Sequence, residues 1–309
     1  MVIKVDNDRL NVEILGIKIK NPVVIASGPA GNGEELSSAI DLSKIGLFTS
    51  KTVTLEKTDG NPPPRIVDVY GGIINSIGLQ NPGFKDFMKN QIPFLEQLPL
   101  QTIISLASNY LEEFEVMVKA LNDRSIEWIE LNFSCPNVDK GKEPIGTNPD
   151  KIYETVKCLK TLTKKPLLVK FAPSETILEL VDASISARAD GVVLSNCPKG
   201  MKIDIHTMKP ILKREYGGFA GPAIKPIALH QVFQVRKAFK NALIIGTGGV
   251  INHEDVLEYL MAGANLVGIG FGVMLDPFLP IHIVHGLSGY MSANDLNYSS
   301  VFCKAQSHR

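Results

Sequence analysis

Residues 130–137, Glu-Leu-Asn-Phe-Ser-Cys-Pro-Asn, place two carboxamides around one thiol directly after an apolar run. Asn132 ends a predicted strand, and strands disfavour asparagine because a buried amide needs hydrogen-bond partners. The pattern therefore indicates a site where Asn132 and Asn137 bind a polar ligand beside the Cys135 thiol. Such a thiol can act as a general base when its surroundings tune its pKa. The alternative is an ordinary Asn-Pro turn with an inert cysteine, because free cysteine often behaves as a small hydrophobe.

Asparagines recur at corresponding places along the chain. Asn75, Asn132, Asn137 and Asn196 each follow a predicted strand or lie in the first long loop. Carboxamides both donate and accept hydrogen bonds. If all four converge on one cavity, they can bind a planar, polar, uncharged heterocycle.

Two lysines end apolar strands: Lys51 in Thr-Ser-Lys-Thr and Lys170 in Val-Lys-Phe-Ala-Pro. An unpaired ammonium in that position is costly, so each lysine predicts an anionic partner, either a ligand or a neighbouring carboxylate. A lysine here can also stabilise the N1–C2=O edge of a reduced flavin. The alternative is that the side chains extend to solvent.

Glycines cluster near the end of the chain, in Gly-Thr-Gly-Gly at 246–249 and Gly-Ile-Gly-Phe-Gly at 268–272. In a barrel, glycines after the seventh and eighth strands let backbone N–H groups approach a phosphate. Gly221, which opens the preceding predicted helix, supplies a third set of amides. The alternative is that these glycines serve tight turns alone.

Alternating strands and helices are expected to position these groups. Short β-branched runs predict strands, and amphipathic stretches between them predict helices. Eight such alternations favour one (β/α)8 TIM barrel domain over residues 1–309, with an open doubly wound sheet as the alternative. The predicted strands cover 23–26, 47–53, 102–107, 128–133, 167–171, 191–194, 242–246 and 266–270, and the helices 34–42, 84–98 (interrupted at Pro93), 111–121, 150–162, 175–187, 226–239, 253–262 and a last segment after 275.

Three further segments lie outside this alternation. Residues 1–20 predict an N-terminal hairpin that caps the barrel floor. Residues 57–83 and 197–221 are longer than ordinary connections between a strand and a helix. Both are predicted to be insertions on the C-terminal face, where barrel enzymes keep their chemistry and where such loops roof a pocket or contact another subunit.

Composition excludes several classes of protein. Lys plus Arg and Asp plus Glu both number 32, which gives no indication of a nucleic-acid or membrane surface. The four cysteines are widely spaced without a CxxC pair, and the six histidines have no metal-ligand spacing, so we expect no metal site and no disulfides. We expect a cytoplasmic protein, because no apolar run is long enough to span a bilayer and residues 1–6 do not resemble a signal peptide.

Taken together, the motifs resemble those of class 1 dihydroorotate dehydrogenases from about residue 12 to residue 280. They are Asn-Phe-Ser-Cys-Pro-Asn-Val at 132–138, Gly-Asn-Pro-Pro-Pro-Arg at 60–65, Asn-Ser-Ile-Gly-Leu-Gln-Asn-Pro-Gly at 75–83, Gly-Pro-Ala-Ile-Lys-Pro-Ile-Ala-Leu at 221–229 and Gly-Thr-Gly-Gly-Val at 246–250. The resemblance implies oxidation of dihydroorotate to orotate in pyrimidine biosynthesis. Cys135 matches the family's base, which takes the C5 proton while C6 delivers hydride to flavin N5. Class 2 enzymes, which are membrane-bound, carry serine there.

The resemblance also implies two sets of binding residues. FMN is expected on Ser27, Lys51, Thr52, Ser105, Asn132, Lys170, Ser195, Gly221, Gly248, Gly249, Gly270 and Phe271. Substrate contacts are expected from Lys51, Asn75, Ser76, Ile77, Gly78, Leu79, Asn132, Asn137, Asn196 and Cys197.

Within class 1, residues 60–65 and 200–204 look more like the 1B subunit than the fumarate-using 1A enzyme. A 1B catalytic subunit is a homodimer that passes electrons to NAD through an iron–sulfur, FAD-containing partner. This chain has no cysteine cluster of its own, so a separate protein would have to supply that function.

Three positions depart from the family pattern. Cys197-Pro198 stands where Ser or Thr without proline is usual, Phe271 replaces a Thr, and Ser105 replaces an Asn that often faces the flavin. The first change leaves a dihydropyrimidine without a carboxylate, such as dihydrouracil, as the competing substrate. Two other readings stay open: a flavin-free, phosphate-binding lyase or isomerase, and a non-catalytic scaffold subunit.

Overall fold

The computed structural model describes residues 9–134 and 144–306. Cys135 and Asn137, predicted as the base and a substrate contact, lie outside the described residues. Within them, no helix is long and apolar enough to cross a membrane.

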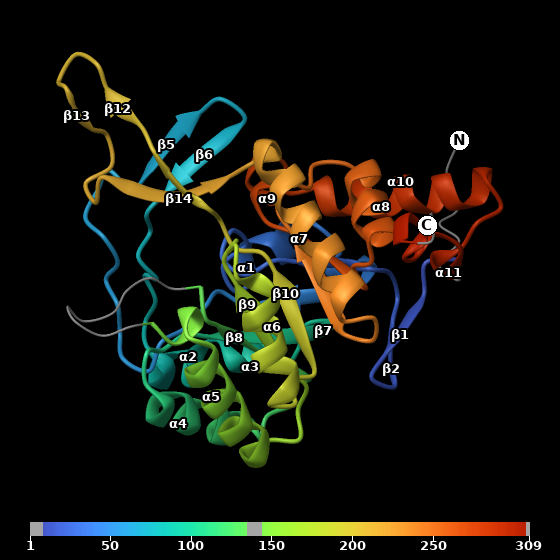
Figure 1. Ribbon diagram of the computed structural model, residues 1–309, viewed down its shortest axis with the longest axis horizontal. Coiled ribbons are helices and arrows are strands. Elements are labelled where there is room, and N and C mark those ends of the chain that lie inside the picture. The colour runs from blue at the N-terminus through green and yellow to red at the C-terminus, as the bar shows by residue number, and fades with distance from the viewer. Residues whose placement is uncertain (1–8, 135–143, 307–309) are drawn as a thin grey trace.

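Eight parallel strands close into a barrel (Figure 1). Their residues are almost all buried, as in a parallel sheet covered on both faces. The predicted (β/α)8 barrel is confirmed, and the open sheet is excluded. In barrel order the strands are β10 (Gly191–Leu194), β15 (Leu243–Thr247), β16 (Leu266–Ile269), β3 (Val23–Ile25), β4 (Leu47–Thr49), β7 (Gln101–Leu106), β8 (Trp128–Asn132) and β9 (Leu167–Phe171).

Helices link the strands and cover the barrel. In α4 (Leu111–Leu121), Phe114, Met117, Val118 and Leu121 recur at helical spacing and are buried. The predicted helix over 84–98 is divided, because Pro93 is tolerated only in the first turn of its second part. The other helices are α1 (Glu34–Ala39), α2 (Phe84–Asn90), α3 (Ile92–Leu95), α5 (Pro149–Leu162), α6 (Ile177–Ser186), α7 (Lys225–Ala238), α8 (His253–Ala262), α9 (Phe271–Leu275), α10 (Leu279–Ala293) and α11 (Tyr298–Val301), with 3-10 turns at Leu42–Lys44, Ile145–Thr147, Pro222–Ile224 and Lys304–Gln306.

The N-terminal hairpin consists of β1 (Val12–Ile14) and β2 (Ile17–Ile19), paired antiparallel. Val12, Ile14 and Ile19 are buried in the main core. A Cβ added at Gly46, directly before β4, would lie 3.1 Å from the Ile19 side chain. The hairpin therefore packs at the N-terminal end of the barrel, as predicted.

The two predicted long insertions form one sheet. The first contains β5 (Ile66–Val69) and β6 (Gly72–Asn75), and the second contains β11 (Lys199–Met201) and β14 (Tyr216–Ala220). They pair antiparallel in the order β11-β14-β6-β5. A further hairpin, β12 (Ile203–Asp204) with β13 (Lys209–Pro210), projects beyond this sheet at the upper left of Figure 1.

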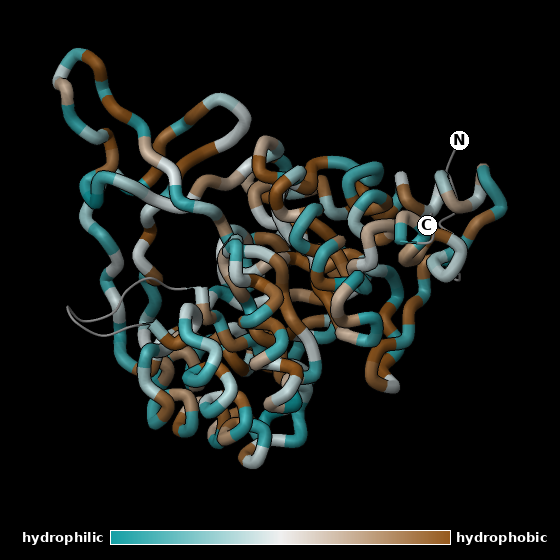
Figure 2. The backbone as a smooth tube through the Cα atoms, in the orientation of Figure 1, coloured by the Kyte–Doolittle hydropathy of each residue, from teal (hydrophilic) through white to brown (hydrophobic). Residues whose placement is uncertain are grey.

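Hydropathy follows this arrangement. Figure 2 shows that hydrophobic residues are concentrated in the barrel and on the inner sides of the helices. The projecting hairpin is an exception, with Ile205 80% and Met208 83% exposed. The barrel thus supplies the stable core, and the inserted sheet stands on its C-terminal side.

Candidate active site

A cavity of about 810 Å³ opens at the C-terminal ends of the barrel strands, next to the inserted sheet. The parallel strands direct their carboxyl ends to this face, so residues far apart in sequence meet there. Almost all the described residues that the sequence assigned to FMN or substrate line it: Ser27, Lys51, Thr52, Asn75, Ser76, Ile77, Gly78, Leu79, Asn132, Lys170, Ser195, Asn196, Cys197, Gly221, Gly248, Gly249, Gly270 and Phe271. Ser105 differs: it is fully buried behind the cavity wall, and its hydroxyl faces Thr52 and Glu130.

One end of the cavity is formed by glycine backbone. Gly221, Gly248 and Gly249 have φ values of 134°, 133° and 72°, which favour glycine. A Cβ at Gly249 would also lie 2.7 Å from the backbone N of Lys225. At Gly270 the nearest atoms to an added Cβ are 3.8 Å away, so that position is open. This end admits a ligand close to the backbone, as a phosphate requires.

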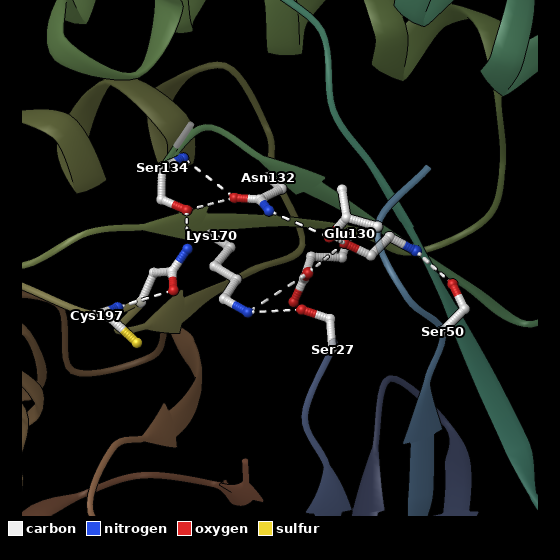
Figure 3. Close-up of polar contacts among 10 residues, drawn as sticks. Ser27, Ser50, Glu130, Asn132, Ser134, Lys170 and Cys197 are labelled. Carbon is white, nitrogen blue, oxygen red and sulfur yellow. Dashed lines mark hydrogen bonds and ion pairs between the residues drawn. The ribbon is translucent and has the colours of Figure 1, made fainter. Parts of the chain in front are cut away.

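Lys170 has the anionic partner that the sequence predicted. Its ammonium donates to Ser27 Oγ at 2.8 Å and lies 3.9 Å from Glu130 Oε1 (Figure 3). Lys170 and Glu130 are 5% and 2% exposed. Either buried charge would be costly alone, so the Lys170 ammonium and the Glu130 carboxylate stabilise each other.

Lys51 differs from Lys170 in its surroundings. It lines the cavity, and among the described residues no carboxylate forms an ion pair with it. Burial, followed by the positive charge of Arg65, lowers the pKa of Lys51. The protein therefore presents an ammonium whose anionic partner is expected to come from a ligand.

Carboxamides meet at the end of β8. Asn132 donates from Nδ2 to Thr52 Oγ1 at 3.2 Å, and its Oδ1 accepts from both N and Oγ of Ser134. Asn196 donates from Nδ2 to the same Ser134 hydroxyl, and its Oδ1 accepts from the backbone N of Cys197. Figure 3 shows Asn132, Ser134 and Cys197 grouped around Lys170.

Asn75 reaches the cavity from the inserted sheet rather than from the barrel. Its Nδ2 donates to Gly218 O at 3.2 Å, which ties β6 to β14. Three of the four predicted asparagines therefore line one cavity, and Asn137 lies outside the described residues. Neighbouring loop residues are held by Asn61, whose Nδ2 donates to Ser76 Oγ at 2.9 Å.

Two residues at this site were missed by the sequence analysis. Ser134 bridges two asparagines, and Glu130 is a buried carboxylate at the barrel interior. Glu130 lies two residues before Asn132 in β8, and the alternation of side chains along a strand places both on one face. That alternation is the signal by which Glu130 could have been found.

Cys197 lines the cavity beside Asn196. Burial raises the pKa of its thiol, opposed by the smaller effect of the Lys170 charge. The thiol is therefore neutral near pH 7, and a neutral thiol is a weak hydrogen-bond donor. This is the position where the family pattern calls for a hydroxyl.

With this geometry established, the chain can be compared with known proteins. The family model for dihydroorotate dehydrogenase matches residues 9–291. The chain belongs to the dihydroorotate dehydrogenase family. A dihydroorotate dehydrogenase B (NAD(+)) catalytic subunit from Alkaliphilus metalliredigens is 43% identical over 91% of this chain and 93% of its own. One from Caldicellulosiruptor saccharolyticus is 41% identical over 93% of this chain and 96% of its own.

A solved structure supports the fold independently. The crystal structure of DHODH in complex with ferulenol from Eimeria tenella matches with a TM-score of 0.80, covering 99% of this chain and 90% of that one. Its sequence is 20% identical, so the likeness concerns the fold alone. Together with the family match, it confirms the resemblance noted from the motifs.

Family membership implies a flavin cofactor, and the cavity suits one. Ser195 Oγ is buried and has no hydrogen-bond partner among the described residues, and Ser195 lines the cavity. Buried polar atoms rarely stay unsatisfied, so a polar ligand is expected there. Lys51 and Lys170 supply positive charge, and the glycine end supplies close backbone approach. These features fit a flavin better than a small substrate phosphate alone.

Proposed function

We propose that the protein is the catalytic subunit of an NAD-linked dihydroorotate dehydrogenase. It oxidises dihydroorotate to orotate in pyrimidine biosynthesis. The relatives named above, which carry that activity in their names, span nearly the whole chain and support this assignment.

The cofactor in this proposal is FMN, which accepts a hydride when bound. Its phosphate would lie at the glycine end, on Gly221, Gly248, Gly249 and Gly270, and its ring near Lys170 and Asn132. Ser27, Lys51, Thr52, Ser195 and Phe271 would complete the site. Ser105 would act on the flavin only indirectly, since its hydroxyl is turned toward Glu130.

Lys51 is the residue that would distinguish a substrate with a carboxylate from one without. Dihydroorotate has a carboxylate and dihydrouracil does not. A half-buried ammonium whose pKa is lowered by burial and by Arg65, with no acid partner among the described residues, is suited to an anion. We therefore favour dihydroorotate, held also by Asn75, Asn132, Asn196 and residues 76–79, with Asn137 and Cys197 as further contacts.

The proton transfer is assigned to Cys135. Its thiolate would take the C5 proton while the C6 hydrogen leaves as hydride. No described residue replaces it as a candidate base beside the predicted substrate contacts, because Lys51 and Lys170 are needed as cations and Cys197 is held neutral. The assignment rests on the Asn-Phe-Ser-Cys-Pro-Asn motif.

Electrons would leave through a separate protein. We propose a homodimer of this chain that associates with an iron–sulfur, FAD-containing subunit and delivers electrons to NAD. The relatives' description as catalytic subunits supports a partner. Among the described residues, no group of three or more His, Cys, Asp or Glu side chains could hold a metal of its own.

An anaerobic titration tests the proposal. The purified protein should be yellow, and L-dihydroorotate should bleach its absorbance near ~450 nm because the flavin ring is reduced. Dihydrouracil is the matched control, since it differs from dihydroorotate only in lacking the carboxylate. Bleaching by dihydrouracil but not by dihydroorotate would contradict the substrate assignment, and a colourless protein that releases no FMN on denaturation would contradict the cofactor.

A further inference from the structure

A buried tyrosine lies behind the glycine end of the cavity. Tyr259, on α8, is fully buried and does not line the cavity itself. Its hydroxyl donates to the carbonyl oxygen of Gly248 at 2.7 Å. Burial raises the pKa of Tyr259, so the hydroxyl keeps its proton, and the carbonyl oxygen can only accept it. One directed hydrogen bond therefore holds the backbone directly after β15.

The sequence leaves room for the tyrosine ring. A Cβ added at Gly246, within β15, would lie 2.6 Å from Tyr259 Cδ1. The first glycine of the Gly-Thr-Gly-Gly motif thus makes space for a side chain behind the cavity wall. Gly248 and Gly249, the last two glycines of the motif, line the cavity. The motif therefore accommodates Tyr259 on one side and a ligand on the other.

The hydrogen bond of Tyr259 determines which way one peptide group faces. The peptide between Gly248 and Gly249 is trans, and in a planar trans peptide the C=O and the N–H point in opposite directions. With Gly248 O directed to Tyr259, the N–H of Gly249 points away from α8, toward the cavity that Gly249 lines. No described residue accepts a hydrogen bond from the N–H of Gly248 or Gly249. Both N–H groups are therefore available to a ligand.

These backbone donors matter because the ammonium of the adjoining Lys225 is already paired. Its Nζ lies 2.5 Å from Asp255 Oδ1 and 3.0 Å from Glu258 Oε2. Asp255 Oδ2 also accepts from the backbone N of Ile251 and of Asn252, which anchors the far end of the glycine loop. These contacts hold the loop in place, but none of them involves the peptide that follows β15.

We infer that Tyr259 is a positioning residue for the phosphate of the proposed cofactor, because its hydroxyl makes the Gly248–Gly249 peptide present an N–H to that phosphate. A peptide between two glycines has the conformational freedom to turn over. The reversed peptide would direct a carbonyl oxygen, with its partial negative charge, at the phosphate. Tyr259 disfavours that state, since its buried hydroxyl would lose its acceptor. The identity of the ligand rests on the proposed function.

Tyr259→Phe tests the inference with two flavins, since it removes the hydroxyl and keeps the ring. The flavin-free, full-length protein is titrated with FMN and separately with riboflavin, which lacks only the phosphate, while flavin fluorescence is followed. FMN affinity should fall about 10- to 100-fold, the range for one hydrogen bond to a charged group. Riboflavin affinity should stay unchanged, because no phosphate meets the peptide.

Tyr298 provides the matched control. It lies on α11 and is also buried, and its hydroxyl likewise donates to a backbone carbonyl, Asn265 O, at 3.1 Å. Asn265 directly precedes β16, so this hydrogen bond lies at the end of the barrel away from the cavity. Tyr298→Phe should leave the affinities for FMN and riboflavin unchanged. The ratio of the two affinities therefore separates a positioning role from a general loss of packing.

Other outcomes would overturn the inference and leave the proposed function intact. They are an unchanged FMN affinity in Tyr259→Phe, equal losses of FMN and riboflavin affinity in that variant, or the same loss of FMN affinity in Tyr298→Phe. A wild-type protein that binds neither flavin would contradict the proposed cofactor and the inference with it.

A second measurement applies if Tyr259→Phe does not stay folded without flavin. The rate of FMN release from the loaded protein is then followed as the change in flavin fluorescence on dilution. Release from Tyr259→Phe should be about 10- to 100-fold faster than from Tyr298→Phe, for the same physical reason. Equal release rates in the two variants would overturn the inference.

Discussion

The glycine end and the polar end of the cavity are built by different means. At the glycine end, Gly221, Gly248 and Gly249 shape the wall with backbone conformations that side chains would strain. At the polar end, Lys51, Lys170 and the Asn132 group provide charges and directed hydrogen bonds. The first selects a ligand by shape, and the second by the arrangement of its donors, acceptors and charge.

This difference predicts how each end responds to substitution. A methyl group added at the glycine end should act through steric exclusion and change cofactor affinity. A charge or proton removed at the polar end should change substrate binding or reaction rate with the cofactor still in place. Variants that separate the two effects therefore test whether the division is real.

The largest effect is expected for Cys135→Ser. Removing the proposed base should slow flavin reduction by dihydroorotate about 10²- to 10⁴-fold, the usual contribution of general-base catalysis. The flavin spectrum should not change, since cofactor binding belongs to other residues. Anaerobic stopped-flow absorbance measures the rate.

Cys158→Ser is the control for that measurement. Cys158 lies on α5, and its thiol donates to Glu115 rather than facing the cavity. Its variant should reduce flavin at the wild-type rate. If Cys135→Ser did the same, Cys135 would have no place in the mechanism.

The next effect is expected for Lys51→Met. Loss of a charged hydrogen bond to the substrate carboxylate should weaken orotate binding about 10- to 100-fold. The pH dependence follows from the lowered pKa of Lys51. As the pH rises through that pKa, the ammonium loses its proton and orotate binding to the wild type should weaken. The weakening should begin at a lower pH than for an ordinary lysine, whose pKa is 10.5.

Two comparisons sharpen the Lys51 prediction. Lys51→Met should bind orotate more weakly, and its orotate affinity should no longer fall at alkaline pH. Its affinity for dihydrouracil should change little. Lys119→Met, on the exposed face of α4, should leave the orotate titration and its pH profile as in the wild type. A Met variant that keeps the alkaline weakening would assign it to another group.

A paired glycine experiment tests the opposite end. In Gly249→Ala the added Cβ meets the Lys225 backbone at 2.7 Å and φ is 72°, which should cost about 1–2 kcal/mol of folding stability and lower FMN affinity. In Gly270→Ala the nearest atom is 3.8 Å away, so the methyl group occupies cavity space without backbone strain.

Gly270→Ala should therefore reduce FMN affinity, by about tenfold if one contact of the cofactor is displaced, and leave the melting temperature of the flavin-free protein unchanged. Fluorescence titration of that protein with FMN and its thermal unfolding separate the two variants. Equal FMN affinity in wild type and Gly270→Ala would show that the cofactor does not approach this position.

The barrel was predictable because its signals are local. Each strand is a short apolar run, and each helix has a repeating apolar face, as in α4. The inserted sheet was expected only as two long loops, because β6 and β14 pair across more than a hundred residues. No local pattern records such a pairing.

For the site, the sequence predicted which residues line the cavity better than it predicted how their side chains are arranged. Motifs identified most of the lining residues, but the hydrogen bonds among Thr52, Ser105 and Glu130 depend on distances between different strands. Ser105 was assigned to the flavin because it stands where the family often has an Asn that faces the flavin. In the structure its hydroxyl is turned away from the cavity to Glu130, which only the assembled barrel reveals.

The smallest effect is expected for Cys197→Ser, which restores the hydroxyl usual in the family. Because burial raises the pKa of the Cys197 thiol, it is neutral at pH 7 and donates only weakly. A serine hydroxyl should tighten orotate binding about fivefold, the value of one hydrogen bond near 1 kcal/mol. Flavin titration measures this change, with Cys303→Ser, outside the cavity, as the control.

The comparison of two ligands locates the new hydrogen bond. If Cys197→Ser tightens orotate and uracil equally, position 197 contacts the pyrimidine ring, and the carboxylate is left to Lys51. Tightening of orotate alone would place Cys197 beside the carboxylate and divide that role between two residues. Weaker binding of both would mean that the thiol packs against the ligand as an apolar group, and the polar end would then be less uniformly polar than its asparagines and lysines indicate.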